Sequence, residues 1–346
     1  MAAGSGPNAV LLIIGVVVVA GAATLASTVF APLALALFIM AIVWPLQLRL
    51  QSVMPRLVAL AITIVLTVAV CLAFASLAVW GFARVGQSIL GDVARYQALY
   101  DAAVAWLDDH GVSVAGLWAE HFNARWVLRY AQSVTTRVNT TLSFWLITLV
   151  YVVLGLLEVE DIRRKIEGLS NREAARVLLD GSTATARKFR KYILVRTQMS
   201  AITGVLVGAF AWATGLQFAL EWGVIAFVLN YIPFIGPFIA TLFPTLLAMA
   251  HFDTWQSVIG VFACLNMIQF VVGSYIEPRV SGNVLAISPS VVLFSILLWT
   301  FLWGLFGTFI GVPIGLAILS FCAQHPTSRW VADLFGGPAE VKPGRA

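Results

Sequence analysis

Charged residues are scarce in this chain of 346 residues: Asp, Glu, Lys and Arg make up 11%, against roughly a quarter in an ordinary soluble domain. Hydrophobic residues make up 60%. Apolar runs such as 10–30 and 57–83 reach the length of about 20 residues that a helix needs to cross a bilayer. This composition excludes a soluble enzyme and a disordered chain, and it predicts an integral membrane protein with several spans.

Cysteines and catalytic motifs are also scarce. The three cysteines, Cys71, Cys264 and Cys322, all lie inside apolar runs, so the sequence predicts neither a disulfide framework nor a metal site. The chain lacks a Walker A sequence, a GxGxxG loop and a nucleophile elbow. We therefore predict no enzyme activity, no ATP-driven pumping and no cofactor.

The apolar residues form eight continuous segments, at 10–30, 32–48, 57–83, 141–157, 199–220, 222–250, 255–276 and 289–322. Continuous runs are typical of helices, whereas a membrane β-barrel alternates apolar and polar residues. The sequence therefore predicts an all-α membrane protein of about eight transmembrane segments. No Lys or Arg precedes Val10, so the first run is interpreted as an uncleaved span rather than a signal peptide.

The polar stretches divide the chain further. We predict N-terminal transmembrane helices over 1–83, an amphipathic helical extracytoplasmic region over 84–140, and a fourth span over 141–157. A basic, helical cytosolic loop is predicted over 158–196. A C-terminal transport core over 197–322 and a cytosolic tail over 323–346 complete this division.

The charges also predict orientation. The loop 158–196 has 10 basic and 6 acidic residues, whereas 84–140 has 5 of each. The positive-inside rule then places both termini in the cytoplasm. A basic cluster beside membrane spans favours anionic lipid as its partner, and nucleic acid is not predicted.

Two segments have the wrong length for simple helices. The 34 residues of 289–322 would form a helix about 51 Å long, against a hydrocarbon core of about 30 Å. The segment 222–250 contains Pro233, Gly236, Pro237 and Pro244. Both are predicted to be Gly/Pro-interrupted or re-entrant helices.

Interrupted helices point to a binding site, because prolines free carbonyl groups that cannot stay unpaired in lipid. The alternative is that these prolines only shape helix packing. Gly307, Gly311 and Gly315 form a GxxxGxxxG pattern that could simply allow close packing of helices.

One apolar segment also carries a polar stripe at helical spacing, formed by Asn266, Gln269, Gly273 and Glu277. A carboxyl group in hydrocarbon can bind a cation or carry a proton, so Glu277 is a candidate functional residue. The alternative is that the amides join helices and that Glu277 lies at the water interface near Arg279. Glu221 and Asp253, at segment ends, are predicted to be interfacial.

Three sequences, NYIPFIGP at 230–237, EPRVSGNVLAISP at 277–289 and LLWTFLWGLFGTFIGVPIG at 297–315, occur in an order and spacing that resemble the autoinducer-2 exporter family of bacterial membrane proteins. The resemblance implies a secondary transporter of the bacterial inner membrane. Some members export autoinducer-2, and others exchange sodium or lithium for protons. It also implies homo-pentamers whose protomers work separately by an elevator-like movement.

The resemblance and the polar stripe together give the candidate solute- or ion-binding residues Asn230, Pro233, Gly236, Pro237, Asn266, Gln269, Glu277, Arg279, Gly282, Gly311 and Pro313, with Pro278 as a further position of the second motif. Three hypotheses remain open. The first is a transporter or exporter of a small polar solute driven by an ion gradient. The second is a sodium(lithium)/proton antiporter, and the third is a non-transporting membrane scaffold.

Overall fold

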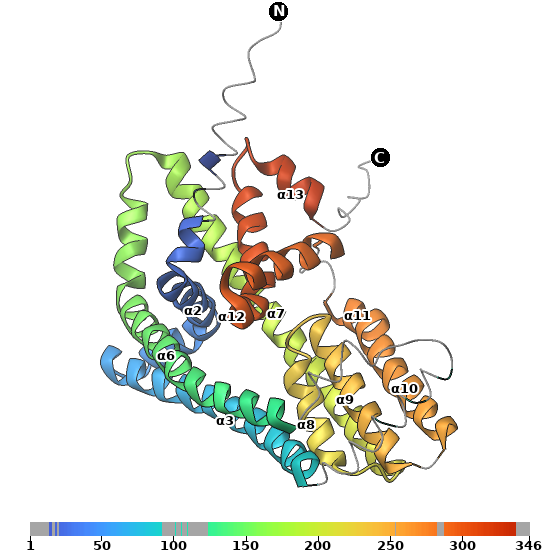
Figure 1. The fold of residues 1–346 in the computed structure, drawn as a ribbon. Helices are drawn as coiled ribbons and strands as arrows, with labels where there is room; N and C mark the ends of the chain where they lie inside the picture. The colour runs from blue at the N-terminus through green and yellow to red at the C-terminus, as the bar shows by residue number, and fades with distance from the viewer. Residues whose placement is uncertain are drawn as a thin grey trace, which may run out of the picture. The chain divides into compact units, whose positions relative to one another are not determined.

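The computed structural model describes residues 14–15, 18, 21–91, 101, 105, 109, 124–252, 254–281 and 287–336, and their regular structure is helical (Figure 1). Within them one isolated antiparallel bridge joins Ile287 to Gly336. The predicted all-α fold is therefore confirmed. About half of the predicted region 84–140, the start of the predicted first span, Asp253 and Gly282 lie outside the described residues.

The helices follow one another as α2 (Ser27–Gln51), α3 (Arg56–Gly91), α6 (Ala124–Glu167), α7 (Arg172–Ala213), α8 (Ala219–Leu229), α9 (Ile235–His251), α10 (Trp255–Phe270), the π-helix η1 (Val271–Ile276), α11 (Glu277–Ser281), α12 (Pro289–Cys322) and α13 (Arg329–Phe335). Among the described residues, 6 helical stretches are long and apolar enough to cross a membrane. The helices α8 and α9 are shorter apolar helices. The prediction of several spans is confirmed.

The charged residues of 158–196 lie on the ends of two long helices. The helix α6 continues to Glu167, and α7 begins at Arg172 and runs without a break into its apolar part. Between them the side-chain oxygen of Asn171 accepts hydrogen bonds from the N–H groups of Glu173 and Ala174, at 3.1 and 3.0 Å. This cap satisfies donors at the start of α7 that have no partner within the helix.

The described chain forms two compact units. Unit 1 comprises residues 1–65, 142–193 and 282–346, and unit 2 comprises 66–141 and 194–281. The helices α3, α6 and α7 contribute residues to both units. The region 197–322, predicted as one transport core, therefore contributes to both units as well.

Unit 1 is built around α2 and α12, which pack against each other. Aromatic side chains join further helices to this core. Phe38 of α2 meets Phe189 of α7 edge to face at 5.0 Å between ring centroids, and Phe144 of α6 stacks on Phe306 of α12 at 3.7 Å. Such pairs stabilise a core beyond the area that they bury.

The helix α12 is a helical hairpin. Gly304 has φ 61° and ψ −141°, in the left-handed region that glycine adopts readily, and the chain reverses there. The hydroxyls of Thr300 and Thr308 lie 2.8 Å apart across this reversal. A Cβ atom on Gly311 would lie 3.0 Å from the carbonyl oxygen of Ser295, so the two arms run antiparallel in close contact.

The GxxxGxxxG pattern faces the first arm of this α12 hairpin. A Cβ atom on Gly307 would collide with the carbonyl oxygen of Trp299, and one on Gly315 would lie 2.7 Å from the hydroxyl of Ser295. These glycines therefore allow the two arms to pack closely, which is the packing interpretation of the pattern. The predicted interruption of 289–322 is also confirmed.

Unit 2 contains α8, α9 and α10 with parts of α3 and α7, and α9 packs against both α8 and α10 (Figure 1). Its buried core includes Val85, Val207, Trp222, Ile225, Leu247, Val261 and Leu265. The helices α8 and α9 form a second helical hairpin, the α8–α9 hairpin, where the predicted segment 222–250 is interrupted.

Candidate functional site

The tip of the α8–α9 hairpin is a short irregular turn between Leu229 and Ile235. Phe234 has φ 63° and ψ −53°, and the N–H of Ile235 donates to the carbonyl of Pro233 at 2.7 Å. This is a γ-turn of the rare, strained kind. The carbonyl oxygens of Asn230 and Tyr231 receive no hydrogen bond from the described residues. The tip therefore presents two backbone acceptors.

Glycine and proline at this tip have local structural reasons. A Cβ atom on Gly236 would collide with the carbonyl oxygen of Leu229, so only glycine allows this approach of α9 to the end of α8. Pro237 lies in the first turn of α9, where backbone N–H groups lack partners within the helix, so its missing N–H costs little.

The helix α7 supplies polar partners to the side chains of the tip. Asn230 is 6% exposed, and its amide nitrogen lies 3.5 Å from the hydroxyl oxygen of Thr203. The hydroxyl of Tyr231 donates to the hydroxyl oxygen of Thr197 at 2.9 Å. These bonds fix the tip against the polar side of α7 within unit 2.

A partly buried ion pair lies next to these contacts. The Nη1 atom of Arg196, the residue before Thr197, is 3.3 Å from Oε2 of Glu277, and the two side chains are 13% and 25% exposed. Removing two charges from water is costly, and removing only one partner of such a pair leaves the other charge uncompensated. The pair therefore holds α11 to α7 and keeps the net charge of this region at zero.

Unit 2 contains buried polar atoms that lack a hydrogen-bond partner among the described residues, and two of them lie on α7 and α10. They are the hydroxyl oxygen of Ser200, which is fully buried one turn beyond Arg196 on α7, and the amide nitrogen of Gln269 on α10. Buried polar groups are nearly always hydrogen-bonded, so each such atom calls for an explanation. A bound polar solute would supply the missing partner.

We call seven residues of unit 2 the hairpin polar cluster: Arg196, Thr197, Ser200, Thr203, Asn230, Tyr231 and Glu277. Hydroxyl, amide, guanidinium and carboxylate groups can together donate and accept hydrogen bonds around a neutral or zwitterionic molecule. Among the described residues, no group of three or more His, Cys, Asp or Glu side chains could hold a metal ion.

The predicted polar stripe does not continue along one face. The amide of Asn266 is exposed and donates to the carbonyl of Phe262 on its own helix, and Gly273 is exposed as well. The reason is η1, because a π-helix has more residues per turn than an α-helix and changes the register of the residues that follow. This register shift precedes Glu277.

The ion-pair partner of Glu277 in the structure is not Arg279, its neighbour in the sequence. Arg279 is exposed, donates to the hydroxyl of Tyr275 at 2.6 Å, and lies 3.9 Å from the centroid of that ring. Glu277 pairs instead with Arg196. Arg196 was assigned to the predicted cytosolic loop 158–196, whereas in the structure it lies within α7.

The remaining candidates from the sequence lie elsewhere. Gly311 and Pro313 are buried in the second arm of the α12 hairpin, in unit 1. Glu221, predicted to be interfacial, is buried within unit 2, and its Oε1 lies 3.3 Å from Nε of Arg84. It occupies the first turn of α8, where the helix dipole favours a carboxylate.

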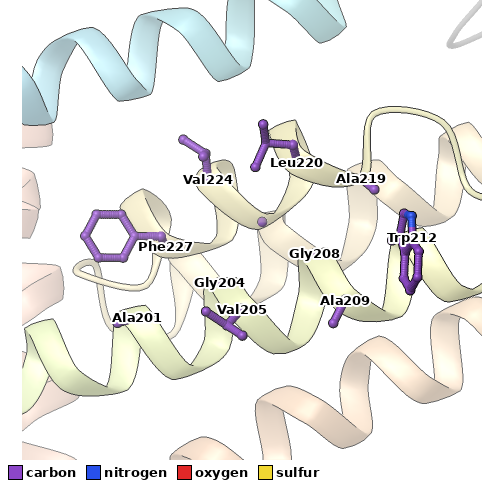
Figure 2. A pocket seen from close by; sticks show the side chains of 11 residues that line it. Ala201, Gly204, Val205, Gly208, Ala209, Trp212, Ala219, Leu220, Val224 and Phe227 are labelled. Atoms are coloured by element: carbon purple, nitrogen blue, oxygen red, sulfur yellow. The ribbon is translucent and has the colours of Figure 1, made fainter.

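An open groove of about 580 Å³ runs between α7 and α8, with Trp212 and Phe227 at opposite ends (Figure 2). It is lined by Ala201, Gly204, Val205, Gly208, Ala209, Trp212, Ala219, Leu220, Gly223, Val224 and Phe227. These side chains are apolar apart from the indole N–H, so the groove offers a polar solute almost no hydrogen-bonding partner. The hairpin polar cluster is the better candidate site.

Sequence reasoning missed the α7 residues of this cluster. Arg196, Ser200 and Thr203 recur at spacings of four and three, a helical pattern that was available in the sequence. Hydroxyl groups in apolar helices are common, however, and only the contacts with Asn230 and Glu277 distinguish these residues from others.

Comparison with known proteins identifies the family. Residues 10–326 match the family described as AI-2E family transporter. The chain belongs to the AI-2E transporter family. It is 28% identical over 322 residues to the AI-2 transport protein TqsA of Escherichia coli (strain K12), covering 89% of this chain and 90% of TqsA.

Other relatives match shorter parts. The putative transport protein YhhT of Escherichia coli (strain K12) is 30% identical over 188 residues, 54% of this chain and 53% of YhhT. The putative transport protein YrrI of Bacillus subtilis (strain 168) is 31% identical over 134 residues, 39% of this chain and 37% of YrrI. The AI-2E family is a family of membrane transporters rather than of enzymes.

Proposed function

We propose that this AI-2E family member is a secondary transporter that exports a small polar solute at the hairpin polar cluster, driven by an ion gradient. The supporting observation is the cluster itself, seven polar side chains gathered beside two backbone acceptors. The first solute to test is AI-2, because the relative TqsA carries the name AI-2 transport protein.

In this proposal the residues have distinct roles. Asn230 and the free backbone carbonyls at the tip bind the solute, and Ser200 donates its otherwise unpaired hydroxyl. Glu277 alternates between Arg196 and a proton or coupling ion, so that the carboxylate is compensated in both states. Gly236 allows the tip to stay closed against Leu229.

Three further parts of the proposal come from the sequence. The chain lies in the bacterial inner membrane with both termini in the cytoplasm, as its loop charges favour. It assembles as a homo-oligomer, and the family resemblance implies a pentamer. Cysteine labelling from either side of the membrane and light scattering of the purified protein test these two points.

The transport experiment uses everted membrane vesicles and two matched variants. Glu277→Gln and Glu221→Gln make the same chemical change, each removing the carboxylate of an ion pair with arginine in unit 2. Both should lower heat stability. Only Glu277→Gln should abolish gradient-dependent uptake of labelled AI-2, measured per amount of folded protein.

Uptake that collapses with an ionophore and is lost in Glu277→Gln alone supports the proposal. Uptake unchanged in Glu277→Gln removes this residue from the mechanism. The absence of uptake by the wild type, in a panel of small polar solutes that includes AI-2, contradicts solute export itself.

Sodium(lithium)/proton antiport is the alternative function. The two carboxylates of unit 2 described above, Glu221 and Glu277, are both paired with arginine, and an arginine competes with a bound metal cation. A fluorescence assay that follows collapse of a pH gradient on addition of sodium or lithium separates the functions. Collapse without any solute requirement would favour the antiporter.

A further inference from the structure

The middle of α7 carries a concentrated group of positive charges. Arg187, Lys188, Arg190 and Lys191 fall within five residues. The helix changes character directly after them, because from Tyr192 to Ala213 its only charged residue is Arg196. In a chain that spans the membrane, such a change along one helix marks the boundary between lipid and water.

Buried aromatic residues fix the direction in which these charges point. Phe189 is buried against Phe38, with their ring centroids 5.0 Å apart, so this side of α7 faces the core of unit 1. Residues three and four apart share a helix face, whereas residues two apart lie on nearly opposite sides. Arg187 and Lys191 each lie two residues from Phe189. Arg190 lies two residues before Tyr192, which is buried in the same core. The three side chains therefore point away from the core, Arg187 exposed and the other two partly exposed, and we call them the α7 cationic face.

No described carboxylate neutralises the α7 cationic face. The acidic residues Glu167 and Asp161 of the same charged segment are paired with Arg163 and Arg164. On the outer side of α7 the preceding carboxylate is Asp180, seven residues before Arg187 and so about 10 Å away along the axis. Three like charges within one turn repel one another, and an external anion would relieve this repulsion.

We propose that the α7 cationic face binds the phosphate of an anionic phospholipid in the adjacent leaflet. Headgroup phosphates lie at the boundary where the charged part of α7 ends, and two guanidinium groups can each donate two parallel hydrogen bonds to phosphate oxygens. Each cation near an anionic surface strengthens binding by about fivefold. This site is separate from the hairpin polar cluster.

Native mass spectrometry of the full chain in detergent tests the proposal. The protein is titrated with phosphatidylglycerol and, separately, with phosphatidylcholine of the same acyl chains. The wild type should retain phosphatidylglycerol preferentially. The variant Arg187→Gln/Arg190→Gln/Lys191→Gln should lose about a hundredfold in apparent affinity for phosphatidylglycerol, and the single variant Arg187→Gln about fivefold. Retention of phosphatidylcholine should not change.

A second triple variant, Arg163→Gln/Arg164→Gln/Arg172→Gln, is the matched control. It removes the same charge from the same segment, but these side chains already bond to Asp161, Glu167 or the Glu167 carbonyl. Its affinity for phosphatidylglycerol should change by less than about threefold. The variant Arg187→Lys/Arg190→Lys, which keeps the charge, should retain most of the binding.

Three outcomes would overturn the proposal. The variant Arg187→Gln/Arg190→Gln/Lys191→Gln could retain phosphatidylglycerol like the wild type, in which case the α7 cationic face is not the site. The matched control could lose as much affinity, in which case only total charge matters. Millimolar inorganic phosphate could displace the lipid, in which case the site binds soluble phosphate. If the triple variant fails to fold, the fivefold loss in Arg187→Gln decides.

Discussion

Replacement of Gly236 by alanine should open the tip of the α8–α9 hairpin. The added Cβ atom would collide with the carbonyl oxygen of Leu229, which also accepts a hydrogen bond from the N–H of Ile232 at 2.8 Å. This carbonyl group belongs to the backbone, so it cannot move away from the added Cβ atom as a flexible side chain could. Overpacking costs about 1–3 kcal/mol and the disturbed hydrogen bond about 1 kcal/mol, against a gain of up to about 1 kcal/mol in helix propensity. The net loss should be about 1–3 kcal/mol.

The assay is the temperature at which half of the detergent-purified protein remains monodisperse after heating, since membrane proteins often unfold irreversibly. A loss of this size should lower that temperature by about 1–4 °C, because the entropy of unfolding scales with the 346 residues of the chain. Gly273→Ala is the control, because a Cβ atom there has no neighbour within 4 Å. This control should be neutral or slightly stabilising. The reasoning is refuted if Gly236→Ala is as stable as the wild type, or if both variants lose stability equally.

Three more predictions use the same heat-stability assay. Gly307→Ala should destabilise the α12 hairpin by about 1–3 kcal/mol, because its Cβ atom would collide with the carbonyl of Trp299; an unchanged midpoint would argue against the close packing of the arms. Glu221→Gln should cost about 1 kcal/mol, since its partner Arg84 is largely exposed and can be solvated, and 0.5 M salt should reduce the difference from wild type. Ser200→Ala should be neutral or stabilise by up to about 1 kcal/mol while lowering transport, because it removes a buried hydroxyl without a partner; a clear loss of stability would mean that this hydroxyl has a structural role.

The parts of the fold that follow from local composition could be predicted. Long apolar runs dictate helices that cross the bilayer, and excess length with glycine and proline predicts a break whatever packs against the segment. Both interruptions are present, at Phe234 and at Gly304. The resemblance in the three sequences likewise led to the correct family, because those sequences are local too.

The parts of the site that depend on contacts between distant residues could not be predicted. One interpretation of the sequence placed Glu277 near Arg279, two residues on, but its partner in the structure is Arg196, 81 residues away. A pattern based on 3.6 residues per turn could not anticipate η1, the π-helix directly before Glu277. A π-helix has more residues per turn, so it changes the side of the helix on which Glu277 lies. Sequence spacing describes one helix at a time, whereas an ion pair depends on how two helices pack.

The sequence by itself therefore determined that this protein is a multi-span helical membrane protein with two interrupted segments, because apolar length and proline act on each segment separately. Only the tertiary structure decided what those interruptions do. In unit 2, packing of the α8–α9 hairpin against α7 brings Asn230 to Thr203. Glu277, which directly follows η1, pairs with Arg196 of α7. In unit 1 the glycines of α12 serve close packing of its two arms. Similar local signals led to a polar cluster in one unit and to a tightly packed hairpin in the other, because the neighbouring helices differ.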